Sequence, residues 1–388
     1  MNAHTKLAFL TLAFLPIPLL PGRPVLAAPT FDELKIGISQ EFENPNPVVM
    51  QMTATHYLYY MTARTLDTMD AKGKWVPMLA KKIPTLEDGT AKFTPDHKQI
   101  QSVWEIKDEA KWSDGHPVTC EDFDFARTVA MSPNVSVPDK ESYEQVAKIE
   151  WDPATPKKCL FTFAKARWDF YQLGTFNALP KHLEEPIFKK YGGQKEGYEK
   201  NSNYVRHPEK DGLACGPYKV SEVVLGSHVS LIPNPYFYGE KPKFKRIVVK
   251  LIPNTGTFEA NLRSGTIDMI SSLGISFQQA LALEKKVKVE NLPFVVNTKP
   301  SLMYEHIDLN MNHPILKDPK VRKALVYGID REEMVKALFE GKQEVALHYE
   351  SPMSVWFTKD PKKITLYPYN RREAARLLDQ AGWKMDRA

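Results

Sequence analysis

Cysteine is scarce in this sequence, and its few thiols follow no metal-binding pattern. Three cysteines occur in 388 residues, at Cys120, Cys159 and Cys215. No pair has a C-x-x-C or zinc-ligand spacing, which argues against a metal site built from thiolates. An odd number leaves at least one free thiol in an oxidising compartment. One disulfide is compatible with the sequence, which does not select the pair, but we favour buried reduced cysteines packed as small apolar side chains.

Motifs of the common enzyme classes are also missing. The sequence has no H-E-x-x-H, no G-x-S-x-G, no G-x-x-x-x-G-K-[ST] and no G-x-G-x-x-G. These are the patterns of zinc proteases, serine hydrolases, phosphate-binding loops and dinucleotide-binding folds. The histidines occur singly, so none stands beside a recognisable catalytic partner in sequence. We therefore expect a protein that is not an enzyme and has no cofactor and no metal site.

No dense block of one charge sign occurs either. The net charge is +5, and the lysines and arginines are spread along the chain. This pattern lacks the clustered basic footprint of nucleic-acid binding, so we expect no nucleic-acid partner. The chain is 43% hydrophobic and 26% charged, which is typical of globular proteins. Its length predicts two or three domains.

One apolar run stands at the N-terminus, and it is too short to span a bilayer. It extends from Leu7 to Leu20, follows Lys6 and precedes small residues. This order is typical of a signal peptide over residues 1–28, cleaved near Ala27 or Ala28. No cysteine follows the run closely, which argues against a lipid anchor. We expect a soluble protein exported to the periplasm; the alternative is a buried N-terminal helix.

Several stretches have the composition or alternation of β-strands. In residues 99–106 we expect Ile100, Val103 and Ile106 to be the apolar positions. A hairpin is predicted to turn near Gly226 and Ser227. The predicted strands are residues 31–39, 99–106, 159–164, the hairpin 218–234 and 244–253.

Helices are indicated by their capping residues. Ser276 with Gln279 has the spacing of a capping box. Asp318 precedes a proline at the first helical position, which favours a helix start there. The capping pattern occurs again at Asp330 with Glu333 and at Asn370 with Glu373, which predicts two more helix starts. Gly341 and Gly382 are expected to end these two helices.

The stretch KWSDGHPVT, residues 111–119, combines an aromatic, an acid and a histidine. We expect a strand over residues 103–112, followed by turn chemistry at 113–115. Thr119 with Asp122 then begins a helix over residues 120–130. Each residue has a local structural role, so we interpret the stretch as a strand-to-helix corner and not as a catalytic loop.

These segments carry a resemblance to a known family. Five stretches in order resemble the family 5 extracellular solute-binding proteins, the dipeptide and oligopeptide receptors of bacterial ABC importers. They are VWEIKDEAKWSDGHPVTCEDFDFA, CGPYKVSEVVLGSHVSLIPNPYFYG, FKRIVVKLIPNTGTFEANLRSGTIDMI, YEHIDLNMNHPILKDPKVRKALVYGIDREEMVKALF and YNRREAARLLDQAGW. The resemblance implies an α/β, two-lobed periplasmic binding protein fold, type II-like and of the large peptide-binding class.

The resemblance also implies a domain organisation. Residues 29–57 plus 171–272 would form lobe I, residues 58–170 an additional small domain packed on it, and residues 273–388 part of lobe II. Family members usually continue beyond the AGW helix, so we expect an incomplete second lobe. In peptide-binding relatives that later portion carries the acidic residue that pairs with the ligand's amino terminus, and no residue here takes its place.

The resemblance implies that the protein is a monomer that captures a peptide by lobe closure. It would deliver the peptide to the membrane permease subunits of an ABC importer. The alternatives are another cargo (a nickel chelate, an opine or a sugar), an exported hydrolase, or a truncated remnant that does not bind. Core packing is the favoured alternative for Tyr304 and Trp356, as a solvated charge is for Glu305, and Asn310 has the alternative of fixing its own turn. The candidate ligand-binding residues are Gln40, Glu41, Ser271, Ser272, Tyr304, Glu305, His306, Asn310 and Trp356.

Overall fold

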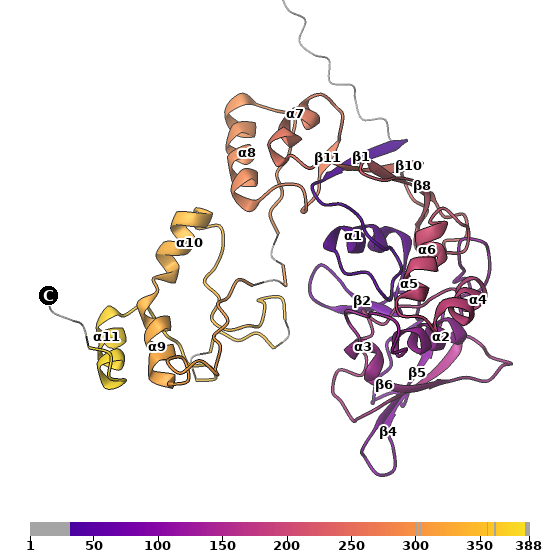
Figure 1. Ribbon diagram of the computed structural model, residues 1–388, viewed down its shortest axis with the longest axis horizontal. Coiled ribbons are helices and arrows are strands. Elements are labelled where there is room, and N and C mark those ends of the chain that lie inside the picture. The colour runs from indigo at the N-terminus through magenta and orange to yellow at the C-terminus, as the bar shows by residue number, and fades with distance from the viewer. Residues whose placement is uncertain (1–31, 300, 303, 355, 361, 385–388) are drawn as a thin grey trace, which may run out of the picture.

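The computed structural model describes residues 32–384 except 300, 303, 355 and 361. It shows a mixed α/β protein in which residues 32–276 form an N-terminal body with a sheet at each end (Figure 1). Residues 277–384 form a C-terminal part made of helices and irregular segments, whose first helix, Phe277–Glu290, lies beside residues 258–263 of the N-terminal body. The predicted signal peptide lies outside the described residues. Among the described helices, none is both long and apolar enough to cross a membrane.

The first sheet has the strand order β11-β1-β10-β9-β8, with β1 at its parallel centre. β1 pairs in parallel with β10 and β11, while β9 and β8 continue the sheet antiparallel. Its apolar side chains, such as Ile38 and Val249, pack against helix α1. The bounds are β1 Glu33–Ile38, β8 Tyr218–Val224, β9 His228–Pro233, β10 Arg246–Leu251, β11 Met269–Ile270 and α1 Thr53–Thr62. The predicted strands and hairpin of this sheet are confirmed, with Gly226 at positive φ in the turn.

The second sheet is antiparallel, in the order β4-β5-β7-β6, and helix α2 packs on it within the largest apolar cluster. In β5 the buried positions are Ile100, Ser102 and Trp104, whereas Val103 is only half-buried. Of the apolar positions expected in this strand, Ile100 is buried and Val103 is not, because the period-two alternation that starts at Ile100 buries Ser102 and Trp104. The bounds are β4 Ala91–Phe93, β5 Ile100–Glu105, β6 Val146–Glu150, β7 Lys158–Phe163 and α2 Cys120–Ala130.

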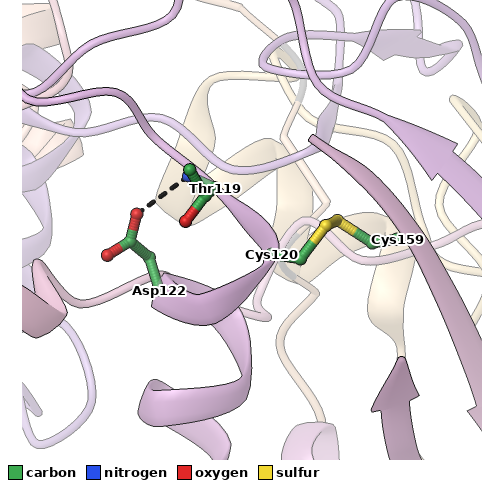
Figure 2. The surroundings of a disulfide bond; sticks show 4 residues. All are labelled: Thr119, Cys120, Asp122 and Cys159. Atoms are coloured by element: carbon green, nitrogen blue, oxygen red, sulfur yellow. Dashed lines mark hydrogen bonds between the residues drawn. A yellow bond between two sulfur atoms is a disulfide. The ribbon is translucent and has the colours of Figure 1, made fainter. Parts of the chain in front are cut away.

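The corner at residues 111–119 is a structural element, as interpreted, although the strand before it ends earlier than predicted, at Glu105. The indole of Trp112 is buried and donates to a carboxylate oxygen of Asp122 at 3.1 Å. The same oxygen accepts from the Thr119 N–H at 2.9 Å, which fixes the start of α2 (Figure 2). The Asp122 carboxylate also accepts from the Lys181 N–H, so this corner anchors a third segment.

Two of the three cysteines form a disulfide. Cys120, the first residue of α2, is bonded to Cys159 in β7 (Figure 2). The expectation of three reduced cysteines is therefore wrong for this pair and holds for the buried Cys215. The pairing could not be read from the sequence because it depends on the packing of α2 against β7, 39 residues apart.

Short elements and two helices escaped prediction. Helix α4 contains Pro186 and starts after Pro180 without a side-chain cap, and α1 starts at an uncapped Met52. Neither therefore shows the usual start signals. The remaining elements of the N-terminal body are β2 Asp67–Met69, β3 Trp75–Pro77, α3 Glu141–Glu144, α4 Lys181–Tyr191, α5 Gly197–Asn201, α6 Asn203–Arg206, η1 Thr255–Thr257 and α7 Phe258–Arg263.

The C-terminal part contains four helices whose predicted starts are confirmed. The side chains of Ser276, Asp318, Asp330 and Asn370 each accept a hydrogen bond from the first turn of their helix. A small apolar cluster joins α9 and α11 through Ala324, Ala374 and Leu377. The helices are α8 Phe277–Glu290, α9 Pro319–Gly328, α10 Arg331–Phe339 and α11 Arg371–Gln380. The predicted division into lobe I, small domain and lobe II stays a prediction.

Candidate functional site

The carboxyl ends of β1 and β11 meet at one edge of the first sheet. The N–H and hydroxyl of Ser39 both donate to the Leu273 carbonyl, at 3.2 and 2.5 Å. The Ser271 N–H donates to the Gly37 carbonyl at 3.0 Å. Ligands of open α/β sheets bind outside this edge. The structure thus brings the segments of Gln40 and Glu41 and of Ser271 and Ser272 together.

These four side chains differ in their burial and in the hydrogen bonds that they make. Ser271 is buried, and its hydroxyl accepts from the Leu273 N–H at 3.1 Å, so it fixes the turn after β11. Gln40 and Ser272 are exposed. A carboxylate oxygen of Glu41 accepts from the Gly226 N–H at 3.4 Å, which links it to the β8–β9 turn. Only the exposed residues of this group offer free polar atoms at the edge.

A pocket of about 80 Å³ lies on the segment that leaves the carboxyl end of β1. Its base is organised by Asn177, which is buried. The Asn177 side-chain oxygen accepts from the Tyr59 hydroxyl at 2.5 Å, and its amide donates to the Pro47 carbonyl at 2.8 Å. The wall is formed by residues from three separate parts of the chain, namely Pro47, Val48, Met50, His56, Tyr59, Tyr60, Pro138, Asp139, Tyr143, Gly174, Thr175 and Asn177.

The tyrosines of this pocket are held as neutral phenols. Desolvation by burial raises the pKa of Tyr59 well above its usual value, and burial likewise raises the pKa of Tyr143. Tyr60, by contrast, is 67% exposed at the pocket rim. Neutral phenols with an amide and apolar walls suit polar but uncharged groups, together with modest apolar side chains.

A buried polar network holds the chain that forms this pocket. The Asn46 amide donates to the hydroxyls of Tyr198 and Ser202, at 3.1 and 3.0 Å. Both hydroxyls donate to the same carboxylate oxygen of Glu184, each at 2.8 Å. Asn46 and Glu184 are fully buried. A satisfied network of this kind fixes the path from β1 to α1, which positions the pocket wall.

The candidates between Tyr304 and Asn310 are placed away from this network. Tyr304 stacks on His306 with ring centroids 4.6 Å apart, and both side chains are exposed. Glu305 is exposed, as expected of a solvated charge. The side chain of Asn310 accepts from the Asn312 N–H at 3.0 Å, which is the turn-fixing role. Their described partners are all local, so the structure does not join them to the pocket.

Trp356 does reach the N-terminal body. Its ring lies edge-to-face against Trp168, with centroids 5.3 Å apart, and the two residues are 60% and 59% exposed. The backbone of Met353 lies close to Gly73, since a Cβ added at Gly73 would fall 2.3 Å from the Met353 carbonyl oxygen. Met353 and Trp356 are therefore in contact with the N-terminal body, and Trp356 is not packed in a core.

A serine, a histidine and an aspartate meet near the corner, but they do not form a hydrolase site. His182 bonds to Asp114 at 2.7 Å and stacks on His116. The Ser113 hydroxyl is buried and accepts from the Gly212 N–H at 2.8 Å, so it supports a turn. Among the described residues, no group of three or more His, Cys, Asp or Glu side chains is arranged to hold a metal ion.

Sequence reasoning missed most of the pocket. His56, Tyr59 and Tyr60 belong to an aromatic-rich run, THYLYY, and this local aromatic density was the one available signal. Asn177 had no such signal, because the partners of its side chain lie 118 and 130 residues away.

The fold thus combines a sheet with a parallel centre, a pocket lined in part by the segment that follows β1, and a C-terminal part that contacts the N-terminal body. The chain belongs to the bacterial extracellular solute-binding proteins, family 5, whose model matches residues 74–388. The predicted family and the predicted α/β, two-lobed periplasmic binding protein fold are thereby confirmed.

Three comparisons show how far the similarity extends. The chain is 28% identical over 331 residues to the oligopeptide-binding protein AppA of Bacillus subtilis, covering 84% of this chain and 54% of that protein. The AppA structure in complex with a nonapeptide matches with a TM-score of 0.68 and 26% identity, over 92% of this chain and 65% of AppA. The oligopeptide-binding protein of Thermus thermophilus with a pentapeptide matches with a TM-score of 0.65 and 25% identity, over 90% of this chain and 63% of that one. The chain thus spans about half to two thirds of its relatives' length.

Proposed function

We propose that this protein captures peptides reversibly in the periplasm and delivers them to the membrane permease subunits of an ABC importer, without a covalent step. The observation that carries the proposal is family membership over residues 74–388, with similar proteins whose structures contain a nonapeptide and a pentapeptide. The signal-peptide pattern supports export. We further propose that the protein acts as a monomer and binds no nucleic acid.

The pocket around Asn177 is proposed to receive one side chain of the peptide. Its volume of about 80 Å³ is enough to admit water molecules. Such waters can satisfy polar side chains or give way to small apolar ones, which permits a range of residues. The exposed Tyr60 at the rim would pack on the bound chain.

The edge formed by Gln40, Glu41, Ser271 and Ser272 is proposed to face the peptide main chain. Polar groups at a strand edge can bond an extended ligand as an added strand would. Tyr304, Glu305, His306 and Asn310 are proposed to approach the ligand from lobe II, and Trp356 from the segment that touches Trp168. The division into lobe I, small domain and lobe II, with the boundaries given above, is part of this proposal.

The proposal is tested by mixing the purified mature protein with a peptide pool and determining the masses of bound and free peptides. Retention of intact peptides is expected. Shortened peptides that accumulate with time would show that the protein is a hydrolase and not a receptor. Retention of a nickel chelate, an opine or a sugar, with no peptide, would show that the protein is a receptor for a ligand other than a peptide. No retention of any ligand would indicate a remnant that does not bind.

A pair of variants locates the binding. Tyr60→Ala removes an exposed ring at the pocket rim and should weaken peptide binding by about five- to thirtyfold, since an aromatic contact contributes about 1–2 kcal/mol. Leu225→Ala removes a side chain that is 86% exposed, from the β8–β9 turn, and should leave binding unchanged. Equal affinities for both variants would place the site elsewhere.

A further inference from the structure

The pocket around Asn177 has an uncharged floor, and a carboxylate lies on its wall. Among the described residues that line it, Asp139 is the one acid, and none is a lysine or an arginine. Asp139 is exposed, whereas Tyr59 and Asn177 are buried, so the carboxylate lies on the side of the pocket that opens to solvent. The neighbouring Lys140 is paired with Glu144 at 3.9 Å. Within the part of the chain that the structure describes, the Asp139 carboxylate forms no ion pair.

Neutral donors hold this carboxylate in place. The Ser142 N–H donates to one oxygen of Asp139 at 3.4 Å, and the Ser142 hydroxyl donates to the other. Since the Ser142 hydroxyl has one hydrogen, the Thr175 hydroxyl, 2.6 Å away, donates to the Ser142 oxygen. These bonds orient the carboxylate and leave its charge uncancelled. Burial, and to a smaller extent the charge of Asp139, raises the pKa of Tyr143 on the pocket wall, so this charge acts inside the pocket.

His56 gives the wall a second acceptor. Its Nδ1 lies 3.1 Å from the Met52 carbonyl oxygen. A carbonyl oxygen only accepts, so Nδ1 carries the hydrogen, and Nε2 of the neutral ring is left as an acceptor. Among the described residues, no hydrogen-bond donor reaches Nε2. The exposed ring of Tyr60 adds an aromatic face at the rim. A carboxylate, a free imidazole nitrogen and an aromatic face together favour a cation with several N–H donors.

We propose that this pocket selects peptides with a basic side chain, lysine or arginine, and that Asp139 determines the selection. The aliphatic stem would lie along the apolar wall formed by Val48 and Met50, and the charged head would pair with the Asp139 carboxylate beside the ring of Tyr60. A side chain with an apolar stem and a charged tip matches a wall that is apolar inside and acidic at the opening. The inference rests on the proposed function, because it assigns the class of side chain that the peptide site receives.

The test compares alanine pentapeptides in which lysine, norleucine or glutamate is placed at each position in turn. Norleucine has the lysine stem without the ammonium group, and the peptide amino terminus is the same in all three series. At its best position, lysine is expected to bind about three- to tenfold more tightly than norleucine, the size expected for an exposed ion pair with an aromatic contact. Glutamate should bind more weakly than norleucine there. Isothermal titration calorimetry measures the dissociation constants.

Variants of Asp139 assign the selection to its charge. Asp139→Asn keeps an oxygen that accepts from Ser142, so lysine should lose its advantage while the affinity for norleucine peptides stays unchanged, which also reports a folded site. Asp139→Lys should reverse the order and make glutamate the tightest of the three. Asp152→Asn is the matched control, since Asp152 is an exposed acid that accepts from the Ala154 N–H at 2.8 Å in the β6–β7 turn. It should keep the lysine advantage.

The remaining outcomes separate this inference from the proposed function. Equal binding of lysine and norleucine peptides by the natural chain would overturn the inference and leave peptide capture intact. An advantage of lysine that persists in Asp139→Asn would place the cation elsewhere and overturn it as well. If Asp139→Asn weakened all three series equally, Asp139 would hold the peptide amino terminus instead of a side chain, which also contradicts the inference. Failure of every series to bind would overturn the proposed function together with this inference.

Discussion

At the residue scale, the buried groups without charged partners are the most informative. Asp67 in β2 is fully buried; one carboxylate oxygen accepts from the Leu173 N–H at 3.1 Å, and the other has no partner among the described residues. Desolvation by burial raises the pKa of Asp67 from 3.8 to about 8. The folded protein therefore binds this proton more tightly than the unfolded chain does, and its stability falls as the pH rises from about 4 to about 8.

Asp67→Asn should remove this pH dependence. Relative to the natural chain, the free energy of unfolding of the variant is expected to increase as the pH rises from 5 to 8, by at most about 1.4 kcal/mol per pH unit, because the variant has no carboxyl proton to lose over this range. Urea unfolding at both pH values checks it. Asp70→Asn is the control with the opposite sign, because the N–H groups of Lys74 and Lys72 lower the pKa of Asp70 and its contribution is lost as the pH falls. If the difference in free energy of unfolding between Asp67→Asn and the natural chain were the same at both pH values, the account would be contradicted.

The free thiol gives a second prediction at this scale. Cys215 is buried, and burial raises its pKa to about 11. Since the thiolate is the reactive form, Cys215 should not react with iodoacetamide at pH 8 in the folded protein and should react fully after unfolding. Mass spectrometry of the labelled protein decides this. Rapid labelling of Cys215 under native conditions would show that the site opens.

At the element scale, local signals predicted what local chemistry decides. The capped starts of α8, α9, α10 and α11 and the turn at Gly226 were readable, because a cap or a positive φ is determined by adjacent residues. Helix α4 was not, because it starts without a side-chain cap and its buried Glu184 is satisfied by residues from α5 and α6. The pocket could not be predicted from the sequence for the same reason, since its wall combines three distant segments.

The disulfide between α2 and β7 is predicted to stabilise the second sheet. Replacing Cys120 and Cys159 together by alanine removes a cross-link that closes a loop of 39 residues. The free energy of unfolding should fall by about 2–4 kcal/mol, chiefly because the unfolded chain gains freedom. Urea unfolding of the oxidised protein and the double variant measures this. Equal midpoints would indicate that the cross-link contributes nothing.

The contact between Trp168 and Trp356 is testable by a double-mutant cycle. Edge-to-face aromatic pairs contribute about 0.5–1.5 kcal/mol beyond their burial, so the two alanine variants should be non-additive by that amount in unfolding free energy. Trp356 paired with Tyr60 is the matched control and should be additive. Additivity of Trp168 with Trp356 would show that segment 351–357 does not rest on the N-terminal body in solution.

At the scale of the whole molecule, the sequence predicted the family and the α/β fold because five motifs occur in order along nearly the whole chain after the N-terminal segment. It could not predict which candidates would be brought together. The segments that carry Gln40 and Ser271 lie side by side because β1 and β11 are parallel neighbours, whereas Tyr304 to Asn310 keep local partners. The N-terminal body is a packed framework with its own pocket, and the C-terminal part supplies the segment that touches it.

Hydrogen exchange of the purified chain, with and without a peptide pool, is the most direct measure of reversible peptide capture. The account predicts slower exchange over residues 47–60 and 174–177, reversal when the peptides are removed, and peptides recovered at their original masses. Unchanged exchange over both segments, or peptides recovered in pieces, would contradict it.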